Sequence, residues 1–319
     1  MNIVKAPFRI SFFGGSTDYE DFYEKHGSFL IGATIDKYVY LSMRKRPSIF
    51  SKESIVTYSK LQHVKSWDEV ENPLIREVLK YKQIQDPIEF LSFSDIPSRT
   101  GLGGSSAFCV GMLYLINRVF DHPEITKKGL VDDAVYIERH LLNEPGGIQD
   151  QIWPAYGGLN TIEIRKNGDF LIKPLSITPE FKNELERSMV LIYTNDQREQ
   201  DTIAKSHENK DRTSILDISK QAHVAFLKEN TNHIGKFLYQ SWLEKRGISN
   251  LISTPKVDTI IDTVMKMGAY GAKLLGSGGC GFILVICDPF IKHKIKEVFK
   301  DSIMEFNFSD NGVTEVLKH

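Results

Sequence analysis

A glycine-rich turn lies at residues 97–108, which read PSRTGLGGSSAF and lead directly into an apolar stretch. Glycine permits left-handed backbone conformations and lets a ligand approach the main chain closely. A turn of this composition before a helix presents backbone N–H groups and the positive end of the helix dipole to an anion. The turn therefore predicts a phosphate-binding site, and the alternative is an ordinary strand–helix turn capped by serine. The candidate phosphate ligands are Gly101, Gly103, Gly104, Ser105 and Ser106, with Arg99 beside them.

Two other stretches of the chain are also rich in glycine. One begins at Ala6 and reads APFRISFFGGSTDYEDF, and the other begins at Gly271 and reads GAKLLGSGGCGFILVI. The G-x-x-x-x-G-K-[ST] phosphate loop is absent from the sequence, and no G-x-G-x-x-G dinucleotide fingerprint opens the helix after residue 104. The motifs thus exclude those two nucleotide-binding classes.

Taken together, the three stretches resemble, in their order and spacing, the motifs of the GHMP small-molecule kinases, which include galactokinase, homoserine kinase and mevalonate kinase. Within that family the chain most resembles the bacterial D-glycero-D-manno-heptose 7-phosphate kinases, through phrases such as GGIQDQIWPAYGGLN and GAKLLGSGGCGF. The resemblance implies ATP and Mg²⁺ as cofactors and a small-molecule sugar phosphate as partner. It also implies an α+β, two-lobed GHMP-kinase-like fold, with an N-terminal ribosomal-protein-S5-domain-2-like lobe and a ferredoxin-like C-terminal lobe.

Phosphoryl transfer requires positioning and charge neutralisation, usually with a metal ion on the phosphates. The resemblance places Ser105 where a hydroxyl contacts magnesium; because Gly104 replaces the family's first serine, Ser106 is an alternative. It places the second magnesium ligand at Glu138, which flanks the apolar face of a predicted helix that includes Leu141. A partly buried carboxylate needs a cation, and the alternative to a metal is an ion pair with a basic side chain.

The resemblance assigns the catalytic role to Asp150 and Arg9. Asp150, in GGIQDQIW, matches the catalytic aspartate of galactokinase-like members, and it would either accept the proton of the acceptor hydroxyl or orient that hydroxyl. Arg9 would lie beside Asp150 and offset charge that develops on the transferred group. A turn aspartate that caps its own backbone and a surface salt bridge are the alternatives.

The resemblance also suggests how an acceptor sugar is held. Asp18, in GGSTDY, matches an aspartate that accepts hydrogen bonds from sugar hydroxyls. Gly15 and Ser16 stand where galactokinase has an acid and a histidine, which leaves room for a bulkier or anionic group. A substrate phosphate would need basic ligands, and Lys245 and Arg246 are the first candidates, with a solvated helix face as the alternative. Other basic candidates are Arg99, Arg44, Lys45 and Arg198.

The third glycine stretch, Gly276, Ser277, Gly278 and Gly279, is expected to close against the turn at 97–108 and support it through backbone contacts.

The predicted function is phosphorylation of the anomeric hydroxyl of a heptose 7-phosphate by ATP, giving a 1,7-bisphosphate for the synthesis of a nucleotide-activated heptose. The alternatives are another sugar 1-kinase of the fucose or galactose type, or an inactive relative that senses a sugar. The combination of Arg9, Ser105, Glu138 and Asp150 favours an enzyme over an inactive relative.

The elements that position these residues follow from apolar periodicity. Strands are expected at FRISFF, SFLIGATI, YVYLSMRK, SIVTYS, IEFLSFS, near 159–173, and at MVLIYT, AKLLGS and FILVIC. Helices are expected at 72–83, 105–119, 128–142, 199–207, 211–229, 231–245, 255–267 and 290–300, and a loop is expected from residue 146. The pattern changes near residue 186, which predicts an N-terminal unit at 1–185 that binds ATP and sugar and a C-terminal unit at 186–319.

Composition limits the class of protein. The chain has 319 residues, is 41% hydrophobic and carries a formal net charge of −1, so it has ample apolar material for a core and no basic excess for nucleic acid or an anionic membrane. It holds no apolar run long enough to span a bilayer. Cys109, Cys280 and Cys287 lack metal-ligand spacing and are expected to be packing thiols. These features predict a cytoplasmic protein that binds neither nucleic acid nor membrane.

Overall fold

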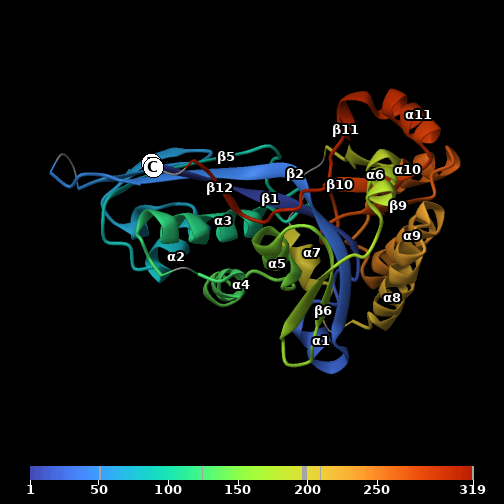
Figure 1. The fold of residues 1–319 in the computed structure, drawn as a ribbon, viewed down its shortest axis with the longest axis horizontal. Coiled ribbons are helices and arrows are strands. Elements are labelled where there is room, and N and C mark those ends of the chain that lie inside the picture. The colour runs from blue at the N-terminus through green and yellow to red at the C-terminus, as the bar shows by residue number, and fades with distance from the viewer. Residues whose placement is uncertain (50–51, 124, 196–199, 209, 318–319) are drawn as a thin grey trace.

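Two β-sheets with helices against them make up the fold, seen in a computed structural model that describes residues 1–49, 52–123, 125–195, 200–208 and 210–317 (Figure 1). The larger sheet has eight strands and the smaller has four. The predicted α+β class is confirmed.

The larger sheet runs in the order β12-β1-β2-β5-β3-β4. In addition, β6 pairs with the N-terminal part of β2, and β7 pairs with β6. Its strands are β1 (Asn2–Phe13), β2 (Ser28–Lys45), β3 (Ser54–Thr57), β4 (Leu61–Val64), β5 (Ile88–Ser94), β6 (Leu159–Ile164), β7 (Phe170–Pro174) and β12 (Thr314–Leu317). The long antiparallel pair β1–β2 lies at the centre of the sheet: β12 pairs with β1, and β5 and β6 both pair with β2.

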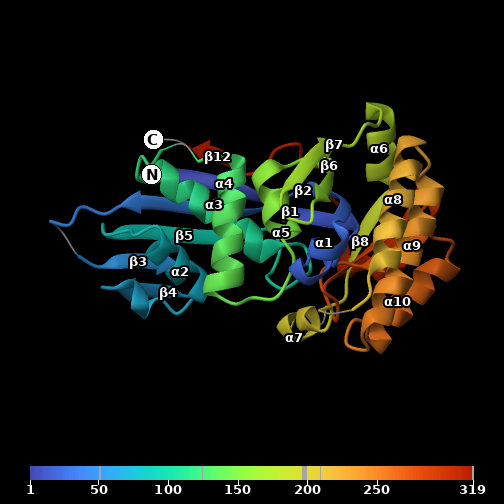
Figure 2. The ribbon, with the colours of Figure 1, turned by 90° about the horizontal axis from the view of Figure 1, so that it is seen from below.

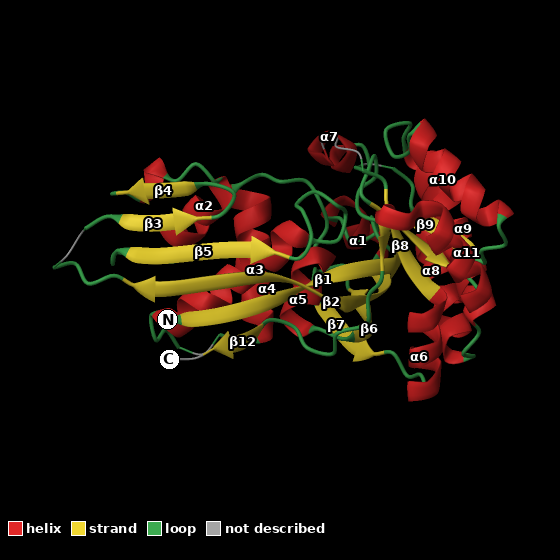
Figure 3. Ribbon diagram, turned by 90° about the horizontal axis from the view of Figure 1, so that it is seen from above, coloured by secondary structure: helices red, strands yellow, loops and turns green. Residues whose placement is uncertain are grey.

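Helices cover one face of this sheet, as Figures 1 and 2 show. They are α2 (Pro73–Tyr81), α3 (Gly104–Val119), α4 (Lys127–Val135), which continues as the π-helical turn η2 (Tyr136–Leu141), and α5 (Gln149–Tyr156). Figure 3 shows the sheet from the opposite side, with these helices behind the strands. The glycine turn at 97–108 and Asp150 therefore lie on the same side of the sheet.

The smaller sheet has the antiparallel order β11-β8-β10-β9. Its strands are β8 (Met189–Tyr193), β9 (Gly271–Leu274), β10 (Phe282–Ile286) and β11 (Ile303–Met304), and its helices are α8 (Thr213–Leu227), α9 (Thr231–Ile248), α10 (Pro255–Lys266) and α11 (Pro289–Phe299). This order, with helices between β8 and β9 and between β10 and β11, is the ferredoxin-like arrangement. The remaining elements are α1 (Glu20–His26), α6 (Pro179–Ser188), α7 (Gln200–Lys205), η1 (Trp67–Glu69) and η3 (Lys300–Ser302).

One hydrophobic cluster runs through both parts of the molecule. Phe12 and Phe13 of β1 meet Phe226 of α8, with ring centroids 6.0 and 6.2 Å apart. β12, far beyond the predicted division near residue 186, pairs with β1. The predicted unit at 186–319 thus gives its last strand back to the first sheet, and the first sheet shares its core with the second.

Local sequence signals mark several helix starts. In α2, α6, α10 and α11 a polar side chain accepts a backbone N–H at the N-cap and proline follows at the first helical position. Proline has no N–H to leave unpaired there, and its fixed φ suits a helix start.

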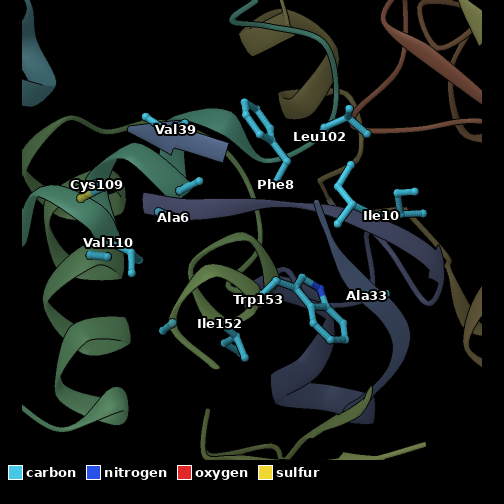
Figure 4. Packing of buried hydrophobic residues seen from close by; sticks show 14 of the residues in the cluster. Ala6, Phe8, Ile10, Ala33, Val39, Leu102, Cys109, Val110, Ile152 and Trp153 are labelled. Atoms are coloured by element: carbon cyan, nitrogen blue, oxygen red, sulfur yellow. The ribbon is translucent and has the colours of Figure 1, made fainter. Parts of the chain in front are cut away.

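Three expectations about local structure were wrong. The predicted loop from residue 146 contains α5, two predicted strands form the single strand β2, and α1 and α6 were not expected. Pro154 and the flanking glycines gave α5 the appearance of a loop, but the helix is held by burial, since Ile152 and Trp153 pack among β1 and β2 (Figure 4). The three cysteines are free and buried, as expected.

Candidate active site

Arg9 and Asp150 form a bidentate ion pair between β1 and the first turn of α5. Arg9 Nε donates to Asp150 Oδ1 and Nη2 donates to Oδ2, both at 2.9 Å. The Arg9 side chain is 4% exposed while that of Asp150 is 30% exposed. Arginine matches a carboxylate with two parallel hydrogen bonds, so the pair fixes the orientation of the carboxylate and leaves one side of it open.

Arg9 also ties this pair to the glycine turn. Its Nη1 donates to the Gly101 carbonyl at 2.6 Å, and its backbone N–H donates to Leu102. Gly103 adopts φ 74° at the start of α3, and a Cβ there would lie 3.0 Å from Arg9 Cγ. The turn, the cation and the carboxylate therefore form one contiguous surface at the N-terminal end of α3.

Glu138, Ser106 and Gln151, here called the Glu138 cluster, lie next to that pair. Ser106 Oγ donates to Glu138 Oε2 at 2.8 Å, and Gln151 Nε2 also donates to Glu138 Oε2. Glu138 is 1% exposed, and burial raises its pKa above the usual range. Gln151 Oε1 is buried without a hydrogen-bond partner. The cluster is thus a buried carboxylate with neutral donors and an unpaired oxygen.

The π-helical turn explains why Glu138 is buried more deeply than its sequence position suggested. Within η2 the backbone N–H of Leu142 donates to Ile137, five residues back. This wider turn shifts the phase of the helix, so Leu141, expected on the apolar face, is 37% exposed while Glu138 faces the core.

The oxygen set of the Glu138 cluster fits Mg²⁺. Magnesium prefers one or two protein oxygens and completes its shell with phosphates and water. The Glu138 cluster offers a single carboxylate, a hydroxyl and an orphaned amide oxygen. Among the described residues, no group of three or more His, Cys, Asp or Glu is placed to hold a metal. Ser106 rather than Ser105 contacts Glu138, and Ser105 is exposed, so the geometry favours the alternative register.

The loop at residues 276–279 lies against the glycine turn. Gly101 and Gly276 have φ values of 79° and 73°, and a Cβ on Gly276 would lie 2.4 Å from Gly101 Cα. Only glycine at both positions allows this approach. Lys245 supports the loop from below, donating to the carbonyls of Leu274 and Gly276, and its burial holds its pKa well below the usual range.

Asp18 lies in a tight turn at residues 14–19, here called the Asp18 turn. It is 1% exposed and accepts the backbone N–H groups of Ser16 and Gln149, both at 3.1 Å. Gly147 packs directly on its carboxylate, since a Cβ there would lie 1.9 Å from Asp18 Oδ2. Burial first, and then the nearby Asp150 charge, raise the pKa of Asp18 to about 6. The two carboxylates are therefore close enough to influence each other.

Comparison of the sequence with family profiles identifies the family of the chain. The profile described as GHMP kinases N terminal domain matches residues 72–158, and the one described as GHMP kinases C terminal matches residues 222–300. The chain belongs to the GHMP kinase family. As a member it is a phosphotransferase, and the kinases of this family use ATP as phosphate donor.

Several proteins are similar to this kinase over nearly its whole length. A D-glycero-alpha-D-manno-heptose 7-phosphate kinase of Campylobacter jejuni is 29% identical, covering 97% of both chains. A galactokinase of Thermotoga maritima is 24% identical, covering 94% of this chain and 93% of its own. A solved D-glycero-D-manno-heptose 1-phosphate kinase from Bacteroides thetaiotaomicron superposes with a TM-score of 0.82 at 23% identity, over 100% of both chains, which shows the two-lobed fold.

The remaining basic candidates that the structure describes lie at the surface of the kinase. Arg246 is exposed and pairs with Asp258 at 2.9 Å. Two other basic candidates pair on the surface, Arg44 with Glu89 and Lys45 with Asp86. Arg99 is exposed, with φ 61°, in the connection before α3, and Arg198 lies outside the described residues. A cavity of about 660 Å³ lies around Asp36, Glu186 and Glu305, and none of the predicted site residues lines it.

Sequence reasoning missed five residues that complete the site: Gln149, Gln151, His207, Arg212 and Lys273. Gln149 and Gln151 flank Asp150 in the motif GGIQDQIW, and this adjacency is the signal that could have suggested them. Lys273 is buried and donates to the Phe12 carbonyl at 2.8 Å; burial, and next the Arg9 charge, lower its pKa to about 7. No motif marks His207 or Arg212. In the part of the kinase that the structure describes, no helix is both long and apolar enough to cross a membrane.

Proposed function

We propose that this kinase transfers the γ-phosphoryl group of ATP to the anomeric hydroxyl of a heptose 7-phosphate, giving the 1,7-bisphosphate, a precursor of nucleotide-activated heptose. The observation that carries the transfer is the Arg9–Asp150 pair placed between the glycine turn and the Asp18 turn. The acceptor assignment is supported by the similarity to the Campylobacter jejuni enzyme over nearly the whole chain.

In this proposal the glycine turn holds the phosphates of ATP. The amides of Gly101, Gly103 and Gly104 at the start of α3 present N–H groups to the anion. Ser106 and Glu138 would hold Mg²⁺, which supplies charge neutralisation on the β- and γ-phosphates when bound. Ser105 and Arg99 are exposed beside the turn and would contact the phosphates from the solvent side.

Asp150 acts on the acceptor. The exposed side of its carboxylate accepts the proton of the attacking hydroxyl or orients that hydroxyl. The hydroxyl oxygen forms a bond to the γ-phosphorus as the bond to the β-phosphate oxygen breaks and ADP leaves. Arg9 offsets the negative charge that develops on the transferred group. Asp18 accepts hydrogen bonds from sugar hydroxyls, and burial and the Asp150 charge set its pKa.

The far end of the sugar passes Gly15. A Cβ there would lie 3.3 Å from Ser11 Oγ and 3.5 Å from Gln149 Nε2, so glycine keeps these polar atoms free of a crowding side chain. For the substrate phosphate we propose Arg246, with Lys245 supporting the loop beside it. The exposed Arg246–Asp258 pair contributes little to stability, so the guanidinium is free to exchange Asp258 for a phosphate.

The test compares heptose 7-phosphate, free heptose, fucose and galactose by ADP release, with the product position determined by NMR. Two charge-assisted hydrogen bonds to the phosphate give a preference of roughly a hundredfold in kcat/KM for the phosphorylated heptose. Arg246→Ala should remove much of it, whereas Asp258→Asn, which breaks the same surface pair, should leave it intact. Equal or better turnover of an unphosphorylated hexose would overturn the heptose assignment in favour of another sugar 1-kinase, the function printed for the galactokinase relatives.

A further inference from the structure

Ser16, in the Asp18 turn, is held in a conformation that serine rarely adopts. Its φ is 78°, in the left-handed region. Its N–H donates to Asp18 Oδ1 at 3.1 Å, and its carbonyl accepts from Arg212 Nη1 at 2.9 Å. Such backbone strain persists only where the surroundings fix it, and it concentrates at functional sites.

The Ser16 side chain is held by His207, which belongs to the segment between α7 and α8. His207 is fully buried, and its Nδ1 lies 2.9 Å from Ser16 Oγ. Its other nitrogen, Nε2, lies 2.9 Å from the Ser277 carbonyl in the loop at residues 276–279. The Tyr19 ring stacks on it, with centroids 6.1 Å apart and an angle of 22°. One imidazole therefore connects the first glycine motif to the third.

The hydrogen-bond partners fix the tautomer of His207. A carbonyl oxygen only accepts, so Nε2 must carry the proton that it donates to Ser277. Burial, followed by the nearby Lys245 charge, lowers the pKa of His207 to about 4, and the Arg212 guanidinium acts in the same direction. The ring is thus neutral at physiological pH, and Nδ1 must accept the Ser16 hydroxyl proton.

We propose that His207 is a positioning residue that makes the Ser16 oxygen an obligate hydrogen-bond acceptor for a sugar hydroxyl and couples the Asp18 turn to the loop at 276–279. The inference rests on the proposed function in one respect, since it takes the Asp18 turn as the acceptor site. With its own proton donated to His207, Ser16 Oγ can only accept from a ligand, as Asp18 does. Ser16 and Asp18 together thus select hydroxyl groups.

Two substitutions separate the two hydrogen bonds of His207. The amide of asparagine reaches the position of Nδ1, so His207→Asn can still accept from Ser16 but loses Ser277. The longer glutamine reaches the position of Nε2, so His207→Gln can still donate to Ser277 but loses Ser16. His233→Gln, at an exposed position of α9, is the matched control. Thermal melting checks that each variant folds.

Kinetics are measured with whichever sugar of the panel is turned over, so that a wrong heptose assignment does not affect the test. His207→Gln and Ser16→Ala should each raise the KM for the sugar about five- to tenfold with the KM for ATP unchanged, the effect of one hydrogen bond. The double variant should be no worse than the more severe single one. His207→Asn should keep the sugar KM near that of wild type and raise the KM for ATP. Equal effects of Asn and Gln, or additive effects of His207→Gln and Ser16→Ala, would overturn the proposal.

A second measurement is independent of catalysis. NMR of ¹⁵N-histidine-labelled kinase should show His207 as the neutral tautomer with the proton on Nε2, and Ser16→Ala should shift its Nδ1 resonance. If no sugar were turned over, the proposed function would fail while this tautomer still appeared. The opposite tautomer, or a charged ring at pH 7, would contradict the role of His207 itself.

Discussion

The two halves of the active site are built in different ways. The catalytic half, which comprises the Arg9–Asp150 pair and the Glu138 cluster, draws all of its side chains from the N-terminal strands and helices. The Asp18 turn is held from both parts of the molecule, because His207 and Arg212 reach it from positions 191 and 196 residues further along the chain than Ser16. The Arg9–Asp150 pair and the Glu138 cluster thus depend on one part of the chain, while the conformation of the Asp18 turn depends on contacts between two distant parts of it.

This difference predicts that substitutions in the catalytic half change turnover and those in the Asp18 turn change acceptor binding. The largest effect is expected for Asp150→Asn, which keeps the shape of the side chain but removes the charge that Arg9 pairs with. kcat should fall roughly 10³-fold, within the range for a general base or an orienting charge, and the KM for ATP should stay unchanged.

Asp132→Asn is a suitable control for this change, because it removes a carboxylate from an exposed pair with Lys128. Its kcat should equal that of wild type. Near wild-type turnover by Asp150→Asn would remove this residue from the catalytic half.

The metal site gives the next largest effect. Ser106→Ala and Glu138→Gln should each raise the Mg²⁺ concentration for half-maximal activity about tenfold or more, the scale on which even outer partners of a metal change its affinity. Ser105→Ala, one residue away and exposed, should leave the Mg²⁺ titration unchanged. If Ser105→Ala alone shifted the titration, the hydroxyl ligand would follow the family pattern without the one-residue displacement.

The same contrast explains how far the sequence could predict the site. The glycine turn, Arg9, Glu138 and Asp150 lie in contiguous motifs whose local geometry is largely determined by the adjoining strand or helix. The choice between Ser105 and Ser106 depends on which side of α3 faces Glu138, and a π-helical turn that no periodicity reveals decides how deeply Glu138 lies. Helix α5 resembled a loop because tertiary burial outweighs its unfavourable Pro154.

The residues that the sequence did not reveal share one property. His207, Arg212 and Lys273 act through contacts to segments far away in the chain, so no spacing rule connects them to the motifs that they hold. Lys245 was identified, but as a substrate ligand, and the structure shows its ammonium group donating to the loop carbonyls. Long-range partners of this kind follow from how the elements pack, which a single sequence does not specify.

The smallest expected effect concerns stability and tests the buried charge of the Asp18 turn. The pKa of Asp18 in the folded kinase is about 6, above its ordinary value of 3.8, so folding favours the protonated form. The cost of burying the carboxylate is fully present above pH 6 and disappears as the pH falls through 6 towards 4. Wild-type kinase should therefore gain stability on acidification from pH 8 to pH 5 relative to Asp18→Asn, by about 1.5 kcal/mol, roughly half of the full cost, which amounts to a few degrees in Tm. The Asp18→Asn variant also loses hydrogen bonds that the carboxylate accepts from Gln149 and Ser16. That loss of stability is the same at every pH, so it does not affect how the difference between the two proteins changes with pH. Melting curves at pH 8, 7, 6 and 5 measure the difference; a gap between wild type and variant that stays constant over this range would mean that Asp18 carries no unusual charge cost and that the Asp18 turn is solvated like an ordinary surface.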